Sequence, residues 1–380
     1  MSALTPTPDI LVHICCSVDS HYFLSELRKL YPQSEMLGFF YNPNIHPKSE
    51  YDLRLRDVER SCKMLGIRLL EGEYNDTQWY ASVRGLEDEP EKGERCVKCF
   101  DMRLEKSAQI AQKMTIPHFT STLLSSPLKE QPILFAEGDS IASRYGLEFI
   151  KIDVRSNGGT QAQSALANRD NLYKQTYCGC QFALTKQRDS KKELALELMS
   201  NIGRQVTPGS NEQRAAVFAL RDECEREGRS YALYKQPKIL WRNLRSLCLD
   251  EGSAINSYII THSRSKNMIK TSTITYIPQL IEDRAHTPRR VNVGFARRDD
   301  SVFLSIESVN ILLHTDYASA QDMLYNPPSF ESELALRSAL CGADSINPII
   351  VLDSEIERSL KIFINAHFQE GSIFAIATHL

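Results

Sequence analysis

Six of the ten cysteines occur as three close pairs in the first half of the chain. They are the adjacent pair Cys15 and Cys16, the CxxC pair Cys96 and Cys99, and the CxC pair Cys178 and Cys180. A disulfide between adjacent cysteines is strained, so oxidation does not account for the first pair. Thiolates at these separations can instead converge on one metal centre if the three segments meet in space.

Three kinds of thiol site compete for this pattern. A structural zinc site commonly takes two CxxC pairs, and here it would leave two thiols unused. A thiol–disulfide oxidoreductase would use Cys96 and Cys99 at a helix start and leave four cysteines unexplained. An iron–sulfur cluster with an additional iron accounts for all six, so the pattern favours it while the other two stay open.

A carboxylate lies close to the first pair. Asp19 follows Cys16 by three residues and could serve as a metal ligand or as a proton donor beside the metal. A helix is expected to begin near this position, so Asp19 could equally be its N-cap. The residue types alone leave both roles open.

Alternating elements are predicted to position these cysteines. Short apolar runs predict strands at residues 9–14, 34–42, 67–74, 118–124 and 147–154. Helical spacing is found at residues 20–31, 48–66, 96–114, 132–146, 163–175 and 181–201. This alternation predicts an α/β fold, a Rossmann-like parallel sheet with right-handed crossovers and helices on both faces.

The predicted elements place the cysteine pairs where chemistry is favourable. Cys15 and Cys16 come at the carboxyl end of the first strand, where open α/β sheets bind their ligands. The second pair opens a helix, whose dipole is expected to lower the pKa of both thiols. Gly179 between the third pair permits a tight turn around a cluster.

Composition and length predict a globular protein of two domains. The 380 residues are 42% hydrophobic and 24% charged, with a formal net charge of −3. We expect a catalytic iron–sulfur domain at residues 1–200 and an α+β accessory domain of unknown role at 210–380, joined by a turn-rich linker. Near-neutral charge argues against a nonspecific polyanion binder but leaves room for a local basic patch.

The chain is expected to be cytoplasmic and free of disulfides. Its opening residues, MSALTPTPD, lack the basic start and the apolar stretch of a signal peptide. No uninterrupted apolar run approaches the ~20 residues that span a bilayer, so no membrane partner is expected. Cysteines in that compartment stay reduced.

Five ordered stretches carry a resemblance to a known family. They are LVHICCSVDS, FFYNPNIHPKSEYDLR, GLEDEPEKGERCVKCFDMRLEKSA, FTSTLLSSPLKE and NLYKQTYCGCQFAL. Together they cover residues 10–190, and this part of the chain resembles the QueH family of epoxyqueuosine reductases. The short members of that family lack the C-terminal half.

The resemblance implies a tRNA-modifying oxidoreductase. Such an enzyme reduces the epoxide of epoxyqueuosine, at the wobble position of the anticodon, to the alkene of queuosine. The resemblance further implies a 4Fe-4S cluster beside a second, mononuclear iron, held by Cys15, Cys16, Cys96, Cys99, Cys178, Cys180 and Asp19. The sequence shows no flavin or nicotinamide motif, so an external donor such as a ferredoxin or flavodoxin is expected to supply electrons.

The family match also suggests residues for proton transfer and substrate binding. Asp19 and Tyr177 are the candidate proton donors. The candidate substrate-binding residues are Tyr41, Asn42, Asn44, His46, Tyr51, Arg54, Ser126 and Lys129. For the YNPNIHP segment, a plain turn that uses Asn and Pro for backbone reasons is the alternative.

The stretch CCSVDS supports a more specific fold. PP-loop nucleotide hydrolases carry SGGxDS between their first strand and helix, and here cysteines replace the glycines. This similarity favours a sheet of the adenine nucleotide α-hydrolase type. The runner-up function is an iron–sulfur tRNA-thiolating enzyme, which would need the Gly-rich loop that this chain lacks. A zinc-stabilised RNA-binding module is the non-enzymatic alternative.

Overall fold

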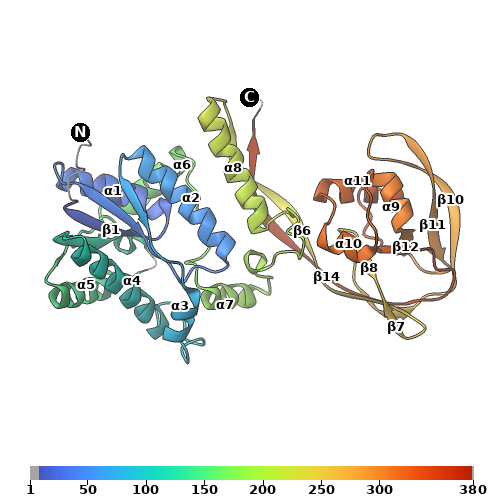
Figure 1. Cartoon of the computed structure of the whole chain (residues 1–380), viewed down its shortest axis with the longest axis horizontal. Helices are drawn as coiled ribbons and strands as arrows, with labels where there is room; N and C mark the ends of the chain where they lie inside the picture. Colours follow the sequence, from blue (N-terminus) through green and yellow to red (C-terminus); the bar gives the residue numbers. More distant parts are fainter. Residues whose placement is uncertain (1–7, 128, 379–380) are drawn as a thin grey trace. The chain divides into compact units, whose positions relative to one another are not determined.

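The computed structural model describes residues 8–127 and 129–378, and Figure 1 shows their elements along the chain. The chain folds as two compact units, Met1–Leu198 and Met199–Leu380. Most of the opening segment MSALTPTPD, which lacks the features of a signal peptide, lies outside the described residues. No described helix is both long and apolar enough to cross a membrane.

The first unit is built on a five-stranded parallel sheet. Its strands are β1 (Ile10–Ile14), β2 (Met36–Phe40), β3 (Arg68–Glu71), β4 (His118–Ser121) and β5 (Glu148–Phe149). The strand order is β3-β2-β1-β4-β5, with every neighbouring pair parallel. Every residue of β1 and β2 is buried, as expected for strands covered on both faces. The predicted α/β class is therefore confirmed.

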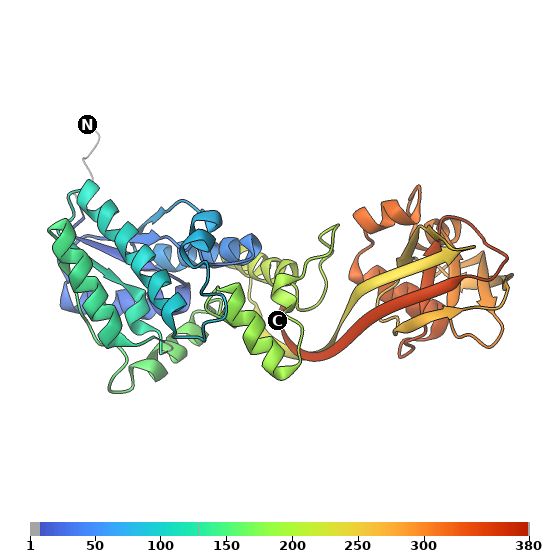
Figure 2. The same cartoon turned by 90° about the horizontal axis from the view of Figure 1, so that it is seen from below.

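Helices connect the strands and cover the sheet (Figures 1 and 2). They are α1 (Ser17–Leu30), α2 (Lys48–Met64), α3 (Asp76–Ser82), α4 (Glu94–Lys113), α5 (Gln131–Tyr145), α6 (Gly159–Arg169) and α7 (Gln181–Lys191). Helix α1 packs against α2 and α6, whereas α4 packs against α5. The chain leaves β1 toward β2 and returns to β1 at β4, so the carboxyl ends of β1 and β4 form a topological switch point.

Several local boundaries differ from the sequence prediction, among them strand β5, which spans Glu148–Phe149 although a strand is predicted at residues 147–154. Helix α6 begins at Gly159, inside the predicted loop, and ends at Arg169 rather than near residue 175. Helix α7 ends at Lys191 because Lys192 adopts a left-handed conformation, with φ of 57°. The N-cap of α1 is Cys16, so Asp19 lies within the first turn and is not the cap.

Close packing of α5 on β5 depends on a glycine. A Cβ at Gly138 would lie 2.2 Å from Cδ1 of Phe149. Alanine in a helix is intrinsically favoured over glycine by about 1 kcal/mol. The steric conflict is the larger effect, since overpacking a core costs about 1–3 kcal/mol.

We therefore expect Gly138→Ala to lower the free energy of unfolding, whereas Ser140→Ala, on the exposed side of the same helix, should be neutral. Urea denaturation in a Trp241→Phe background measures this, because Trp79 is then the sole tryptophan reporter. Equal stabilities of the two alanine variants would contradict the packing.

The second unit contains one long helix, two sheets and a helical layer. Its helices are α8 (Asn211–Glu227), α9 (Ile306–Leu313), α10 (Ala320–Tyr325) and α11 (Phe330–Cys341). One sheet has the order β10-β11-β12-β13-β8 and comprises Ile274–Glu282, Pro288–Ala296, Val302–Ser305, Ile349–Leu352 and Ser257–Ile259. The other has the order β7-β6-β14-β9 and comprises Ser253–Ile255, Ala232–Asp250, Lys361–Ala377 and Lys266–Lys270. The C-terminal part is thus α+β, as predicted.

Candidate metal centre

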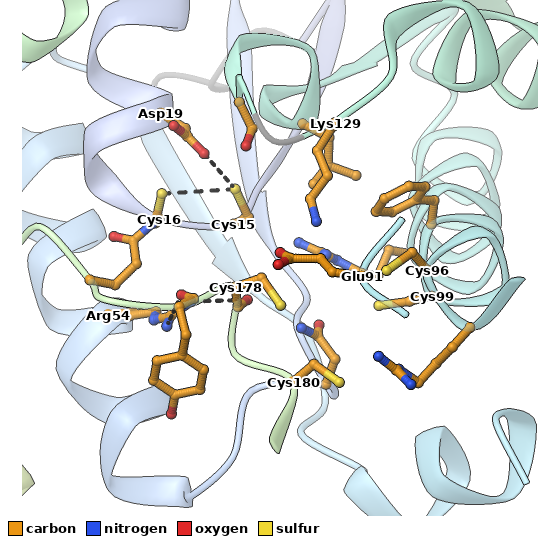
Figure 3. Close-up of a pocket in the computed structure, with 18 of the residues that line it drawn as sticks. Cys15, Cys16, Asp19, Arg54, Glu91, Cys96, Cys99, Lys129, Cys178 and Cys180 are labelled. Carbon is orange, nitrogen blue, oxygen red and sulfur yellow. Dashed lines mark hydrogen bonds between the residues drawn. The ribbon is translucent and has the colours of Figure 1, made fainter. Parts of the chain in front are cut away.

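All six paired cysteines and Asp19 line one pocket of about 160 Å³ in the first unit. Figure 3 shows Cys15, Cys16 and Asp19 as one group, with the other four cysteines across the pocket. All ten cysteines of the chain are free thiols, in agreement with the expectation of no disulfides. Soft thiolate donors in such number are compatible with an iron–sulfur cofactor.

The first group lies at the switch point of the sheet. One ligand atom each of Cys15, Cys16 and Asp19 lies within 4.8 Å of the others. The Sγ of Cys15 is 3.9 Å from the Sγ of Cys16 and 3.5 Å from Oδ2 of Asp19. Two thiols and one carboxylate at this spacing can share a single metal ion, with coordination positions left open for another ligand.

Contacts from distant segments hold the first group in place. The hydroxyl of Thr122, directly after β4, accepts a hydrogen bond from the Cys15 amide at 3.3 Å and lies 3.4 Å from its Sγ. The hydroxyl of Ser125 donates to the backbone carbonyl of Asp19 at 3.2 Å. The amide Nε2 of Gln163, on α6, donates to Asp19 Oδ1 at 2.7 Å, which leaves Oδ2 beside Cys15.

Burial makes the first group electrostatically unusual. Desolvation raises the pKa of the Asp19 carboxyl well above its ordinary range, and the neighbouring Cys15 adds to the effect. The pKa of Cys15 is lowered, because Cys16 hydrogen-bonds to it and Arg103 lies nearby. The pKa of Cys16 is raised correspondingly. Such a cluster of perturbed groups in a pocket is typical of functional sites.

The second group comes from two segments. Cys96 and Cys99 lie in the first turns of α4, and Cys178 and Cys180 flank Gly179 directly before α7. Gly179 has φ of 109°, and a Cβ there would lie 2.7 Å from Cγ1 of Ile45, so the turn requires glycine. Burial raises the pKa of Cys96, which makes the expected dipole-lowered pKa wrong for that thiol.

Buried cations surround the thiols, and three of them are anchored by the protein. Arg54 forms an ion pair with Glu50 at 2.8 Å and donates to the carbonyls of Tyr177 and Cys178. Arg95 donates to the carbonyls of Leu86, Glu87 and Glu89. Arg103 donates to Asn42 Oδ1 at 2.6 Å and lies 3.4 Å from His13 Nε2. Together they brace the segments that carry the cysteines.

Lys129 differs from the three arginines. It is 9% exposed, and among the described residues it forms no ion pair with a carboxylate. Burial opposes its charge, but the thiols of Cys178, Cys96 and Cys99 outweigh burial and raise its pKa. Figure 3 shows its side chain pointing into the pocket. A buried lysine without a carboxylate partner fits a negatively charged group at this position.

The structure divides the candidate substrate-binding residues into two sets. Those that line the pocket are Asn44, Arg54, Ser126 and Lys129, together with Tyr177. Those outside the pocket lining are Tyr41, Asn42, Tyr51 and His46.

The residues outside the lining have structural contacts. Asn42 donates to the carbonyl of Ile14 at 2.8 Å and accepts from Arg103. Tyr51 is buried, and its hydroxyl donates to Glu71. Tyr41 stacks on Phe39 with ring centroids 5.8 Å apart. Of these three side chains, Asn42 contacts a residue of the pocket lining, Arg103, whereas the partners named for Tyr41 and Tyr51 lie outside the lining.

Several side chains of the site carry no local sequence signal. His13, Thr122, Gln163 and Arg103 lie far apart in the chain, and each reaches the first group or its support through long-range contacts. Thr122 could have been predicted as a site residue, because it directly follows β4 and strand ends at a switch point bind ligands. Nothing in the sequence distinguishes Gln163 and Arg103 from other polar residues of their helices, so only the tertiary structure shows their roles.

Comparisons with known proteins match this chain to one family. The family model described as epoxyqueuosine reductase QueH matches residues 10–186. Epoxyqueuosine reductase QueH of Helicobacter pylori is 40% identical over 374 residues, which is 96% of this chain and 99% of that protein. The Thermotoga maritima protein of the same name is 33% identical over 189 residues, or 49% of this chain and 95% of that protein.

A solved structure is also weakly similar. It is the U34-tRNA thiolase NcsA from Methanococcus maripaludis with its 4Fe-4S cluster, at 12% identity and a TM-score of 0.33. The similarity covers 59% of this chain and 68% of that chain. The match to the Helicobacter pylori protein, by contrast, extends over both units of this chain. This chain therefore belongs to the epoxyqueuosine reductase QueH family.

Proposed function

We propose that this chain reduces the epoxide of epoxyqueuosine at the tRNA wobble position to the alkene of queuosine. The net reaction consumes two electrons and two protons, breaks both carbon–oxygen bonds of the epoxide and releases the oxygen as water. The observation that carries the proposal is the convergence of six thiols and Asp19 on one pocket in a member of this family.

The geometry supports a division of the ligands. Cys15, Cys16 and Asp19 have ligand atoms close enough to share one ion, and they would hold the second iron. The other four thiols line the same pocket and would hold the 4Fe-4S cluster, which takes four cysteines. When bound, these groups supply single electrons and Lewis acidity. Lys129 would offset the negative charge that a cluster with thiolate ligands carries.

The remaining pocket residues would bind and orient the nucleoside. Asn44 has a buried Oδ1 without a hydrogen-bond partner, so it offers an acceptor to a substrate hydroxyl or amine. Ser126 lines the same pocket. Asp19 and Tyr177 are the proposed proton donors. The Tyr177 hydroxyl donates to the carbonyl of His46, so proton release from Tyr177 requires that hydrogen bond to break.

The electron source is proposed to be a protein outside this chain. Single electrons suit a cluster, and a ferredoxin or a flavodoxin delivers them singly. Turnover tests the whole proposal: anaerobic protein, a one-electron donor and tRNA that contains epoxyqueuosine are incubated, and the nucleosides are then analysed. Queuosine should appear in step with the loss of epoxyqueuosine. A thiolated nucleoside, or no change with a fully loaded protein, would refute it.

Gln163 is expected to position Asp19 for the second iron. Gln163→Leu removes the donor to Oδ1 at nearly constant volume, and loss of such a supporting contact weakens metal binding by about 10–100-fold. Iron retained after dialysis against a graded chelator series measures the change. Gln161→Leu, an exposed position on the same helix, is the matched control. Equal iron retention by the two leucine variants would show that Gln163 is not needed.

A further inference from the structure

One face of the sheet β7-β6-β14-β9 in the second unit carries an exposed basic cluster. Strand register places Lys361 opposite Leu249, Phe363 opposite Leu247 and Asn365 opposite Arg245, and residues paired in this way share a face. On β9, Lys270 lies opposite Lys361. We define the basic face as Arg245, Lys270, Lys361, Phe363 and Asn365.

The opposite face of these strands belongs to the core. Cys248, Ile362 and Ile364 alternate with the residues of the basic face and are each at most 1% exposed. Because successive side chains on a strand point to opposite faces of the sheet, the basic face points away from that core. Arg245, Lys270, Lys361 and Asn365 are all exposed, and Phe363 is partly exposed.

The cations on this face have no carboxylate partners among the described residues. In the described part of the chain, none of Arg245, Lys270 and Lys361 forms an ion pair, and no acidic residue belongs to the face. Lys270 and Lys361 are cross-strand partners, and like charges placed directly opposite each other destabilise a sheet. A bound polyanion would remove this repulsion.

Positive charge is also concentrated in the part of the second unit that contains the basic face. Residues 232–298 contain twelve Lys and Arg but four Asp and Glu, whereas residues 299–357 contain one Arg and eleven Asp and Glu. The net charge of the chain is near neutral, although a basic strand-rich segment is followed in the sequence by an acidic segment that contains helices. A segment with such an excess of positive charge attracts a ligand of opposite charge over distances of about a Debye length.

An aromatic side chain lies among the cations. The Arg245 guanidinium is 5.9 Å from the centroid of the Phe363 ring, and Leu247 and Leu249 are partly exposed beside it. Aromatic rings and arginine planes on an exposed sheet stack unpaired bases, while neighbouring cations contact phosphates. A protein partner with an acidic surface would use the charges but would have no need of this stacking arrangement.

We propose that the basic face binds RNA, with Arg245, Lys270 and Lys361 on backbone phosphates and Phe363 under an unpaired base. This proposal rests on the proposed function in one respect, because the RNA we assign to it is the tRNA substrate. It gives the C-terminal unit a role in substrate binding apart from the metal centre.

The test compares two sets of charge-neutralising variants in the full, loaded chain. One combines Arg245→Gln, Lys270→Gln and Lys361→Gln, and the control combines Arg226→Gln, Arg284→Gln and Arg290→Gln, which neutralises three exposed cations elsewhere in the same unit. Fluorescence anisotropy with labelled tRNA measures affinity over a range of salt concentrations. We expect the first set to bind about 10–100-fold more weakly and to lower the salt-dependence slope by about 2. The control set should bind within about 3-fold of the wild type.

A second variant separates stacking from charge. Phe363→Leu keeps an apolar side chain, and we expect it to weaken tRNA binding by about 10-fold without a change in the salt slope. Equal affinities for the two triple variants would overturn the proposal. Unchanged tRNA binding by the first set, together with loss of a self-association that the wild type shows, would assign the face to a protein contact instead.

Binding is measured here without turnover, so the two proposals fail separately. If the wild-type chain forms no queuosine but the first set of substitutions still weakens tRNA binding, the reductase function is refuted and the RNA-binding face is supported. Queuosine formation by a first-set variant with normal tRNA affinity would refute the face alone.

Discussion

Asp19→Ala is expected to abolish reduction of epoxyqueuosine, by at least about 100-fold, while the protein keeps its iron–sulfur absorption. Asp19 belongs to the first group of proposed ligands, within 4.8 Å of the two adjacent cysteines and across the pocket from the other four thiols. Its loss should therefore remove the second iron and leave the cluster in place. Cys15→Ala should behave in the same way, because it removes a ligand of the same group.

Two measurements on the same samples make this prediction specific. Nucleoside analysis after anaerobic turnover reports activity, and absorption near about 400 nm reports the cluster. Asp101→Ala, which removes a more exposed carboxylate on α4, controls for a general effect of losing an acidic residue. Near-normal turnover by Asp19→Ala or by Cys15→Ala would contradict the assignment of the first group.

Cys99→Ala is expected to give the opposite spectroscopic result. Cys99 lies in the second group and is 7% exposed in a small core with Trp79 and Cys180. Loss of one of the four proposed cluster ligands should bleach the absorption near about 400 nm and abolish turnover together. Cys62→Ala provides the matched control, since Cys62 is also buried but lies on α2 and not in the pocket.

Folding must be checked alongside the colour. Cys99→Ser keeps the size of the side chain and should lose the cluster as well, because a serine hydroxyl is a poor substitute for a soft thiolate. Circular dichroism distinguishes a folded, colourless variant from an unfolded one. A folded Cys99→Ala variant with full absorption near about 400 nm would show that the cluster does not depend on the second group.

Most of the first unit follows from local sequence. Strands β1 and β2 are short apolar runs, and their burial on both faces keeps this signal clear. The position of Cys15 and Cys16 at the end of β1 follows from the same pattern. The start of α6 and the end of α7 do not, because they depend on a turn at residues 156–158 and on the left-handed Lys192.

The candidate site was predictable where residue type alone points to chemistry. Six thiols in pairs indicate a metal centre, but a polar residue in a turn is ambiguous. Asn42 and Asn44 share one segment, yet Asn42 is bound to Ile14 and Arg103 while Asn44 lines the pocket. Arg103 on α4, about 60 positions further along the chain, binds Asn42 and so distinguishes it from Asn44. A local sequence pattern does not reveal such a contact.

The second unit shows the same limit on a larger scale. Helix α8 and strands β10 to β13 coincide with patterns in the sequence, but the long strands β6 and β14 do not. Pro237 and several cations interrupt β6, and a register shift at Asn365 and Ala366 breaks the alternation of β14. Strand pairing, which local pattern does not encode, is what reveals the basic face.

Iron and acid-labile sulfide, counted in anaerobically purified protein, test most directly whether six thiols and Asp19 form one redox centre. About five irons and four sulfides per chain are expected, with about four irons and four sulfides in Asp19→Ala. One zinc per chain, or iron without sulfide, would contradict a 4Fe-4S cluster beside a second iron and with it the chemistry proposed for this pocket.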